Sequence, residues 1–308
     1  MQLRLAVPDL VSPSYFPAIA AVELGCFADV GLDVDLRLDF PVTRASEHLR
    51  DGGIDLLAGA AHAALHAFPQ WRGVRLATAL SKGMYWFLVI ATENPQSAAV
   101  NIAELHDLRI GAAPGPDLGL EQALLRAGVD LESAGISIVP VPTDDPDNIS
   151  FGVTAAKALQ QGKIDAFWAN GMGAEVAVKS GAGRIVLDAR RSTGPEQNFT
   201  FPALLVTETM VNQQPDVVER SIKAIATAQR MLREDPGVAT TVGERLFPSF
   251  EAGLISSLIA RDADFYRGEM TPDDIEALNA FARIGGLDPG AASYDEVVLT
   301  QFAAGWLR

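Results

Sequence analysis

Short apolar runs alternate with helical stretches along the first ninety residues. Gly25 is expected to end the first helix, and Ser14 is expected to cap its start. Strict alternation of apolar and charged side chains from Asp33 to Phe40 predicts a half-exposed strand at a sheet edge. The pattern predicts strands over 3–7, 33–40, 54–58, 74–79 and 87–91, and helices from about 15 and over 43–50. This order favours a mainly parallel sheet covered by helices on both faces.

Part of this pattern recurs later in the chain. Residues 49–56, Leu-Arg-Asp-Gly-Gly-Ile-Asp-Leu, share leucine, glycine, isoleucine and aspartate at the same offsets with residues 159–166. Likewise Leu3-Arg4-Leu5 resembles Leu108-Arg109-Ile110, and each run leads to a proline-containing loop. The recurrence indicates two lobes of similar build. Coincidence remains the alternative, because a glycine followed by isoleucine and aspartate is a common way to leave a helix and enter a strand.

The recurrence and the element order suggest a discontinuous first lobe. We expect lobe 1 to comprise residues 1–90 and 200–308, and lobe 2 residues 91–199. Lobe 2 is predicted to hold strands over 108–113, 136–141, 164–169 and 184–187, with helices over 118–127, 154–161 and 173–179. A strand over 201–206 then returns to lobe 1, and a helical tail follows. Two crossings between lobes are typical of a hinged clamshell.

Composition narrows the possible partners. The 308 residues match about two domains. A net charge of −15 leaves no broad basic face for nucleic acid. No apolar run reaches the roughly 18 residues of a membrane span. The start of the chain lacks the features of a secretion signal, so we expect a chain that is either cytosolic or already trimmed.

Ligands of open α/β sheets bind beyond the carboxyl ends of the strands, where loops lead into helices. In lobe 1 this rule selects the segments 9–15 and 59–62, and in lobe 2 the segments 114–118, 150–154 and 169–173. With the segment around Lys82 to Trp86, they would line a cleft. Several aromatic residues lie there, and ordinary packing is the alternative explanation for each of them. The ligand-binding residues predicted in this way are Asp9, Ser14, Tyr15, Gly59, Ala60, His62, Trp86, Gly115, Asp117, Thr154, Trp168 and Asn170.

The sequence contains no catalytic motif that we recognise. His62 and His66 lie four residues apart and could share a helix face as metal ligands, but a packed or surface pair is the commoner explanation. Lys82 is the lysine nearest the expected cleft, and it is a candidate for Schiff-base chemistry or for pairing with an anion. Cys26 is the single cysteine and is expected to be buried and inert. We therefore predict no catalytic residue, no metal and no cofactor.

One stretch near the start of the chain resembles a known group of proteins. Tyr15-Phe16-Pro17-Ala18, running on through residues 21–34, resembles the opening of ABC-importer substrate-binding proteins of the THI5-like group, which includes sulfonate, nitrate, taurine and thiamine-pyrimidine binders. Cys26 stands where the group usually has an aromatic residue. Further similar stretches are 52–60, 111–115 and 155–169. The resemblance implies a type II periplasmic-binding-protein fold, with two doubly wound α/β lobes joined by a two-stranded hinge and a helical C-terminal tail.

The resemblance also implies a function. Such a protein would be a monomer in the periplasm, and it would bind a ligand without acting as an enzyme. It would capture a small heteroaromatic or anionic metabolite by hinge closure and deliver it to an ABC permease at the membrane. Residues 9–15, 59–62 and 114–117 would touch the ligand, with Trp168 and Asn170 opposite. The alternative is a cytosolic enzyme of the same fold, a decarboxylase or a THI5-like synthase acting on a small aromatic acid or pyrimidine. The synthase lacks support because no cysteine-rich run is present.

Overall fold

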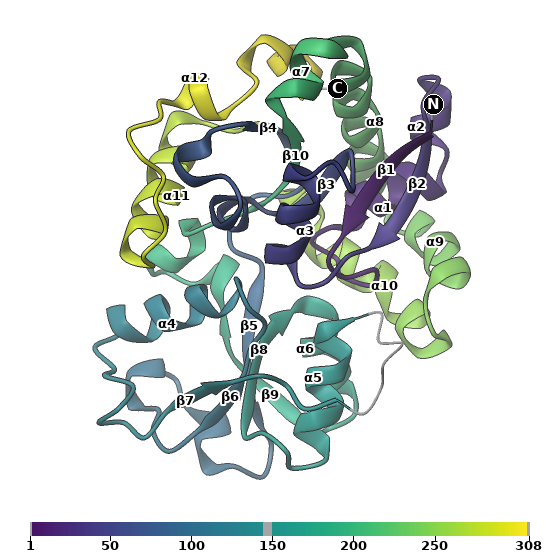
Figure 1. Ribbon diagram of the computed structural model, residues 1–308. Helices are drawn as coiled ribbons and strands as arrows, with labels where there is room; N and C mark the ends of the chain where they lie inside the picture. Colours follow the sequence, from purple (N-terminus) through teal and green to yellow (C-terminus); the bar gives the residue numbers. More distant parts are fainter. Residues whose placement is uncertain (1, 144–149, 307–308) are drawn as a thin grey trace. The chain divides into compact units, whose positions relative to one another are not determined.

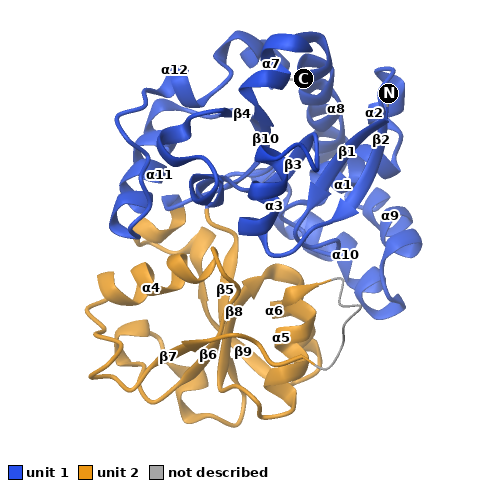
Figure 2. Cartoon of the chain, in the orientation of Figure 1, with its two compact units in different colours: residues 1–83, 198–308 blue, residues 84–197 orange. Residues whose placement is uncertain are grey.

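The computed structural model describes residues 2–143 and 150–306 of the 308-residue chain. The chain divides into two five-stranded α/β units (Figure 1). Unit 1 comprises residues 1–83 and 198–308, and unit 2 comprises residues 84–197 (Figure 2). The first boundary falls between Gly83 and Met84, earlier than expected. The reason is that the strand Trp86–Ala91 pairs with strands of unit 2.

Unit 1 is built on a mixed sheet of order β2-β1-β3-β10-β4. β1, β2 and β3 are parallel, and β10 runs antiparallel to β3 and β4. The strands are β1 (Gln2–Val7), β2 (Asp33–Leu38), β3 (Leu56–Ala60), β4 (Val74–Ala79) and β10 (Pro202–Thr207). The helices are α1 (Phe16–Glu23), α2 (Cys26–Asp29), α3 (Val42–Arg50), α7 (Glu208–Gln213), α8 (Pro215–Glu234), α9 (Val238–Leu246), α10 (Ser249–Asp262), α11 (Pro272–Ile284) and α12 (Tyr294–Val297), with the short 3-10 helices η1 (Ala61–His66), η2 (Pro69–Trp71), η7 (Ala263–Phe265) and η8 (Thr300–Gly305).

Unit 2 repeats this design in the order β7-β6-β8-β5-β9. β6 is parallel to β7 and β8, and β5 is the reversed strand. The strands are β5 (Trp86–Ala91), β6 (Arg109–Gly111), β7 (Ser137–Val139), β8 (Ala166–Asn170) and β9 (Gly183–Asp188). The helices are α4 (Asp117–Arg126), α5 (Phe151–Gln160) and α6 (Gly171–Lys179), with the 3-10 helices η3 (Pro95–Ala98), η4 (Ile102–Glu104), η5 (Ala189–Arg191) and η6 (Pro195–Asn198).

The predicted internal repeat is confirmed down to one ion pair. In unit 1 the Asp55 carboxylate accepts hydrogen bonds from the backbone N–H, Nε and Nη2 of Arg4 at 2.8, 2.9 and 2.8 Å. In unit 2 Asp165 accepts the same three bonds from Arg109 at 2.8, 2.9 and 3.0 Å. Each arginine also donates to the carbonyl of a glycine that follows a helix. Arg4 donates to Gly52 after α3, and Arg109 donates to Gly162 after α5. We call these two arrangements the Arg–Asp clamps. Each one fixes the strand that carries the arginine, β1 or β6, against the strand that follows the glycine, β3 or β8.

Two strand predictions needed correction. β2 lies at the sheet edge as expected, but its alternation ends early. Leu38 is 38% exposed, and Asp39 is buried. Asp39 leaves the sheet because its carboxylate contacts His48 Nδ1 at 2.6 Å and Arg44 Nε at 3.4 Å. The other correction concerns β3, which continues through residue 60 because its antiparallel pairing with β10 extends the ladder.

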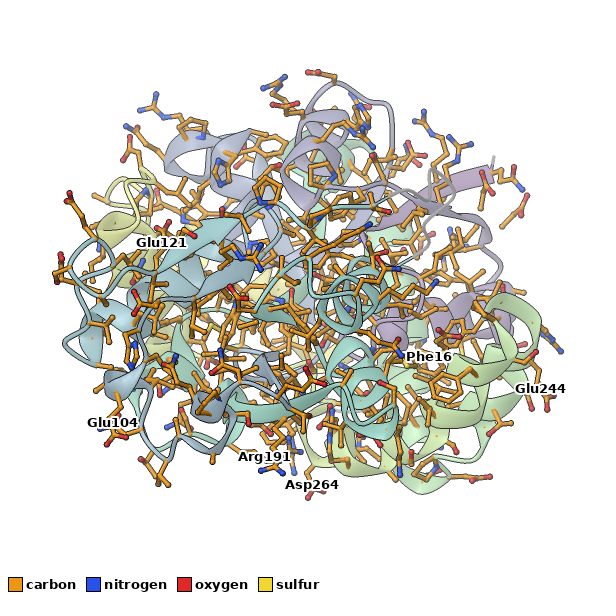
Figure 3. All side chains as sticks on the ribbon, turned by 90° about the horizontal axis from the view of Figure 1, so that it is seen from below. Phe16, Glu104, Glu121, Arg191, Glu244 and Asp264 are labelled. Atoms are coloured by element: carbon orange, nitrogen blue, oxygen red, sulfur yellow. The ribbon has the colours of Figure 1, made fainter. Side chains whose placement is uncertain are left out.

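Buried apolar side chains hold each unit together. The predicted stripe of Val218, Ile222, Ile225 and Leu232 on α8 is fully buried. Phe16 of α1 is likewise buried and packs edge-on against Phe247, whereas charged side chains such as Glu104 and Glu244 project outward (Figure 3). Burial of one face of each helix against the sheet is the main source of stability in such layers.

The tail after residue 236 completes unit 1. Val298 forms a parallel bridge with Leu76 of β4, and the Trp306 indole N–H donates to the Ala77 carbonyl at 2.9 Å. The tail therefore covers the β4 edge, which would otherwise expose unpaired backbone groups.

The two crossing segments run side by side. Within unit 1 the Leu80 N–H donates to the Pro202 carbonyl at 2.8 Å, and within unit 2 the Met84 N–H donates to the Gln197 carbonyl at 2.9 Å. Between these two bonds lies Gly83, whose φ of +73° is in the left-handed region that favours glycine. The chain thus passes between the units on two neighbouring segments, which are hydrogen-bonded to each other on both sides of Gly83.

Candidate functional site

The carboxyl ends of the parallel strands define one edge of each sheet, which we call the carboxyl edge of that unit. In unit 1 it comprises residues 8–15, 60–66, 79–82 and 199–201. In unit 2 it comprises residues 84–86, 112–118, 150–154, 170–173 and 188–191. The twelve predicted ligand-binding residues lie on or within two residues of these two edges, six in each unit.

The loop after β1 is held by its own side chains. Asp9 Oδ1 accepts a hydrogen bond from the Val11 N–H at 3.0 Å, and Ser12 Oγ accepts one from the Ser14 N–H at 3.3 Å. Asp9, Ser14 and Tyr15 are all buried. Ser14 is not the N-cap of α1, because Tyr15 occupies that position and the cap has no side-chain hydrogen bond. The predicted cap is wrong since the Ser12 and Ser14 pair shapes a turn ahead of the helix.

The turn after β3 differs from its prediction. Gly59 and Ala60 belong to the strand, and His62 is the second residue of the 3-10 helix η1 that follows it. His62 is fully buried, with Nδ1 3.0 Å from Thr200 Oγ1. Its ring stands edge-on to Phe281, with 5.2 Å between ring centres. His66 is exposed because the segment is a 3-10 helix, in which residues four apart do not share a face. The pair cannot act as two ligands of one metal.

Lys82 is engaged within unit 1. Its ammonium group pairs with the Asp274 carboxylate and donates to the Glu269 carbonyl at 3.1 Å. It also lies 5.9 Å from the centre of the Phe201 ring. This ion pair neutralises the lysine charge, so neither an open anion site nor Schiff-base chemistry is supported at this residue.

Three helices begin at the carboxyl edge of unit 2, and a side chain accepts backbone N–H groups near the start of each of them. Asp117 Oδ1 accepts the N–H groups of Gly115 and Leu118, both at 2.9 Å, at the start of α4. Ser150 caps α5, and the Thr154 hydroxyl donates to its carbonyl at 3.1 Å. The capping serine moves the start of α5 to residue 151, three residues before the predicted start.

α6 begins next to α5. Asn170 Oδ1 accepts the N–H groups of Met172 and Gly173 at 3.0 and 3.2 Å. A Cβ added at Gly173 would lie 2.5 Å from the Gly152 carbonyl oxygen, so the two helix starts approach at backbone distance. Asn170 and Ser150 are neutral caps, whereas Asp117 places a carboxylate at its helix start. The positive ends of α5 and α6 therefore carry no compensating acidic side chain at the cap position.

Aromatic side chains gather at the same edge of unit 2. The rings of Trp86 and Trp168 lie 6.1 Å apart, and Tyr85 lies 4.6 Å from Trp86. Trp168 is fully buried, and its indole N–H donates to the Pro116 carbonyl at 3.0 Å. A Cβ at Gly119 would approach the Trp86 ring to 3.2 Å, so α4 lies directly on this ring. These contacts fix the orientation of both tryptophans, and their contact with a ligand stays a prediction.

Cys26 and Glu121 both have raised pKa values. Burial raises the pKa of the Cys26 thiol, and the nearby Asp29 carboxylate raises it further. The thiol lies 3.8 Å from Met231 Sδ, away from both carboxyl edges. On α4, burial raises the pKa of Glu121, with Asp117 as a second cause. The predicted burial of Cys26 is confirmed, and its raised pKa disfavours the reactive thiolate.

The opposite edges of the two sheets carry grooves. One of about 810 Å³ lies in unit 1 around residues 49–55 and 67–73, and another of about 590 Å³ lies in unit 2 around residues 159–165. Each is bordered by the aspartate of an Arg–Asp clamp. Because both units form the groove where a helix ends before a strand, we attribute it to the repeated fold.

Two further properties concern the described part of the chain. Within residues 2–143 and 150–306, no three side chains among histidine, cysteine, aspartate and glutamate are grouped so as to hold a metal ion. None of the helices in those ranges combines the length and the apolar character needed to cross a membrane.

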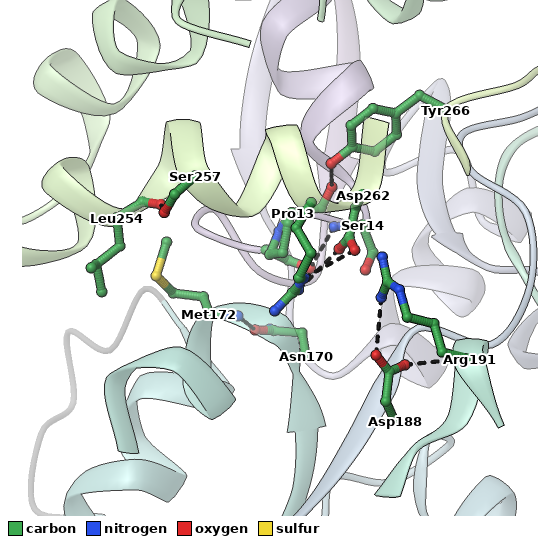
Figure 4. A network of polar contacts seen from close by, with 12 residues as sticks. Pro13, Ser14, Asn170, Met172, Asp188, Arg191, Leu254, Ser257, Asp262 and Tyr266 are labelled. Carbon is green, nitrogen blue, oxygen red and sulfur yellow. Dashed lines mark hydrogen bonds and ion pairs between the residues drawn. The ribbon is translucent and has the colours of Figure 1, made fainter. Parts of the chain in front are cut away.

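Sequence reasoning missed the residues that support the unit 1 edge from the C-terminal tail. The Tyr266 hydroxyl donates to the Pro13 carbonyl at 2.8 Å (Figure 4). Phe281 stacks on Phe199, with 5.1 Å between ring centres and 18° between the ring planes. The Tyr266 contact spans about 250 residues of sequence and the Phe281 contact about 80, so no local sequence pattern predicts them.

Comparisons with known proteins agree with this architecture. The ligand-binding component of an ABC-type import system from Staphylococcus aureus, solved with zinc bound, covers 100% of this chain and 99% of its own length, with 11% identity and a TM-score of 0.75. The alkanesulfonate-binding protein SsuA from Xanthomonas axonopodis pv. citri, bound to MOPS, covers 98% and 97%, with 15% identity and a TM-score of 0.72.

An enzyme shares the fold as well. The desulfurization enzyme DSZB covers 98% of this chain and 96% of its own, with 16% identity and a TM-score of 0.65. No curated protein sequence matches the chain. The profile of the family described as NMT1/THI5 like matches residues 12–239, well over half of the sequence. The protein therefore belongs to the NMT1/THI5-like family and has the type II periplasmic-binding-protein fold.

Proposed function

We propose that this protein is the solute-binding component of an ABC importer. It captures a small heteroaromatic or anionic metabolite at the carboxyl edges of its units, closes by a hinge and delivers the metabolite to a permease. The observation that carries the proposal is the duplicated topology with two hydrogen-bonded crossing segments. Such crossings allow hinge closure because a few residues, here around Gly83, can absorb the change in backbone angles.

The residues at the two edges favour a planar ligand. Buried aromatic rings lie at each edge, with Tyr85 and Trp86 in unit 2 and Phe199 in unit 1. The lysine at the unit 1 edge is already paired with a carboxylate. An anionic substituent would fit best at the starts of α5 and α6, where the caps are neutral. We therefore favour a heteroaromatic ring, with or without one anionic group, over a small inorganic anion.

A thermal-shift panel tests this function. Its members are nitrate, taurine, benzenesulfonate, benzoate, 4-amino-2-methylpyrimidine and riboflavin. A compound at one hundred times its Kd stabilises the folded protein by about 2.7 kcal/mol, which raises the Tm by several degrees. We expect an aromatic member to produce the largest shift and to be recovered unchanged. Stabilisation by metal ions or pyridoxal phosphate, with none from the panel, would refute the receptor function.

The same proposal assigns a place and partners to the protein. A receptor of this kind works as a monomer in the periplasm and meets its permease at the membrane surface. A pull-down with a detergent-solubilised cognate ABC permease should capture only the ligand-loaded form of the protein. Equal capture of empty and loaded protein would contradict delivery by closure, because the permease would then not distinguish the closed state.

A cytosolic enzyme acting on a small aromatic acid or pyrimidine is the second candidate, and the shared fold of the desulfurization enzyme DSZB favours it. An enzyme that uses a cysteine nucleophile has little support in this chain. Cys26 is the single cysteine of the sequence, and it is buried on α2 with a raised pKa. Mass spectrometry of benzoate, biphenyl-2-sulfinate and 4-amino-2-methylpyrimidine after incubation with the protein separates the two. A product from any of them would favour the enzyme.

A further inference from the structure

The C-terminal segment 265–281 contacts four segments of the unit 1 carboxyl edge. We call it the C-terminal brace. It lies beyond residue 239, where the family match ends. Its backbone carbonyls at Gly268 and Phe265 accept the N–H groups of Ala79 and Lys82 at 3.0 and 2.8 Å. Its Asp274 carboxylate pairs with the Lys82 ammonium group. The brace thus fixes the end of β4, directly before the crossing into unit 2.

Two aromatic residues of the brace, Tyr266 and Phe281, contact the remaining segments. The Tyr266 hydroxyl holds the Pro13 carbonyl at 2.8 Å, and the ring is fully buried (Figure 4). The Phe281 ring packs against His62 on one segment and Phe199 on another. Each contact ends on a stretch that the proposed function assigns to ligand binding.

Tyr266 has a particular effect on the loop after β1. Pro13 is followed by Ser14 and Tyr15, and its carbonyl also accepts the Phe16 N–H of the first turn of α1 at 3.4 Å. The tyrosine hydrogen bond therefore sets the direction in which the loop enters the helix. Because a buried hydroxyl and a buried carbonyl both need partners, the bond strongly prefers one loop conformation.

We infer that the C-terminal brace is the positioning element of the ligand site in unit 1, and that Tyr266 is its positioning residue for the loop 9–15. The inference rests on the proposed function, which makes this loop a ligand contact. Tyr266 acts through the Pro13 carbonyl and does not itself touch the ligand. Preorganising the loop lowers the entropy lost on binding, so its effect appears in affinity.

The variant Tyr266→Phe tests this assignment, and Tyr294→Phe is its matched control. Tyr294 lies in the tail outside the brace and donates to the backbone carbonyl of Met270, a residue of the brace, at 2.6 Å, so its loss removes a bond to the brace and leaves the Pro13 bond intact. Hydrogen exchange followed by mass spectrometry needs no ligand. We expect Tyr266→Phe to speed exchange in peptides covering residues 9–19, and Tyr294→Phe to leave them unchanged. Equal exchange in both variants would overturn the inference.

Affinity for benzenesulfonate and for 4-amino-2-methylpyrimidine, measured by calorimetry, gives the second readout. Loss of one hydrogen bond predicts roughly three- to tenfold weaker binding in Tyr266→Phe and an unchanged Kd in Tyr294→Phe. Tyr266→Phe that binds either probe as tightly as the wild type would refute the positioning role. If neither probe binds the wild type while the 9–19 peptides still exchange faster, the brace is supported and the proposed ligand class fails.

Phe281→Leu provides an independent variant should Tyr266→Phe fold poorly. It removes the ring that contacts His62 and Phe199 and keeps an apolar side chain. Faster exchange is expected in residues 58–66 and 197–203, with residues 9–19 unchanged. Uniformly faster exchange throughout unit 1 would instead show a general loss of stability and would contradict a brace with separate attachments.

Discussion

The two Arg–Asp clamps allow one physical argument to be tested twice in the same chain. Replacing Asp55 by asparagine removes the charge and leaves one acceptor oxygen for three donors of Arg4. Hydrogen bonds to charged groups contribute about 1.5–3 kcal/mol when shielded, and exposure reduces this. The Arg4 and Asp55 side chains are 32% and 26% exposed. We expect Asp55→Asn to lower the free energy of unfolding of unit 1 by about 1.5–2.5 kcal/mol.

The clamp of unit 2 should contribute less. Its arginine, Arg109, is 52% exposed, and Asp165 is 32% exposed. Asp165→Asn should therefore cost about 0.5–1.5 kcal/mol in unit 2. The surface pair Arg50–Asp51 provides the control, and Asp51→Asn should have no measurable effect.

Urea unfolding followed by tryptophan fluorescence can separate the units, since each contains two of the four tryptophans. Trp71 and Trp306 report on unit 1, and Trp86 and Trp168 report on unit 2. A larger cost for Asp165→Asn than for Asp55→Asn would refute the argument, because exposure would then not govern the strength of the clamp.

The clamp also predicts a dependence on pH. The hydrogen bonds from Arg4 lower the pKa of Asp55 below its ordinary value of 3.8. Since the pKa is lower in the folded state than in the unfolded state, the stabilisation is complete above pH 3.8 and is lost as pH falls through the folded value. The difference in free energy of unfolding between wild type and Asp55→Asn should stay constant from pH 7 to about 4 and become smaller at lower pH. A difference that narrows already between pH 7 and 5 would contradict this assignment.

Three shorter predictions follow from local geometry. Gly173→Ala should lower the free energy of unfolding by about 1–3 kcal/mol, because its Cβ would meet the Gly152 carbonyl. Gly253→Ala on α10 should raise it by about 0.5–1 kcal/mol, because the added Cβ would meet no atom within 4 Å. Urea unfolding compares the two variants. Cys26 should resist iodoacetamide in the native protein and react fully in urea, because burial raises its pKa; rapid native labelling would contradict its placement. Trp168→Phe should cost about 0.5–1.5 kcal/mol in unit 2 through loss of the indole hydrogen bond, and an unchanged midpoint would argue against that bond.

Local patterns predicted most of the elements because each carries its own signal. The glycine after α3 and the glycine after α5 both adopt positive φ, at +75° and +67°, and both were visible as helix stops. The same motif revealed the repeat, since glycine, isoleucine and aspartate recur at equal offsets. Errors arose where a side chain formed a bond with a distant segment. Asp39 is buried because His48 and Arg44 hold it, which the alternation of β2 could not indicate.

The predicted site residues show the same distinction between local and long-range contacts. At the unit 2 edge the residues around each helix start are held by neighbours within four positions, as with Asn170 and α6, so their place could be inferred from sequence. At the unit 1 edge the loop after β1 and the turn after β3 depend on Tyr266 and Phe281, which lie more than 200 residues further along the chain. Because those contacts depend on tertiary packing alone, only the folded structure reveals them. If the brace shapes the ligand site, exchanging the tail between two members of the NMT1/THI5-like family should transfer ligand affinity together with the tail.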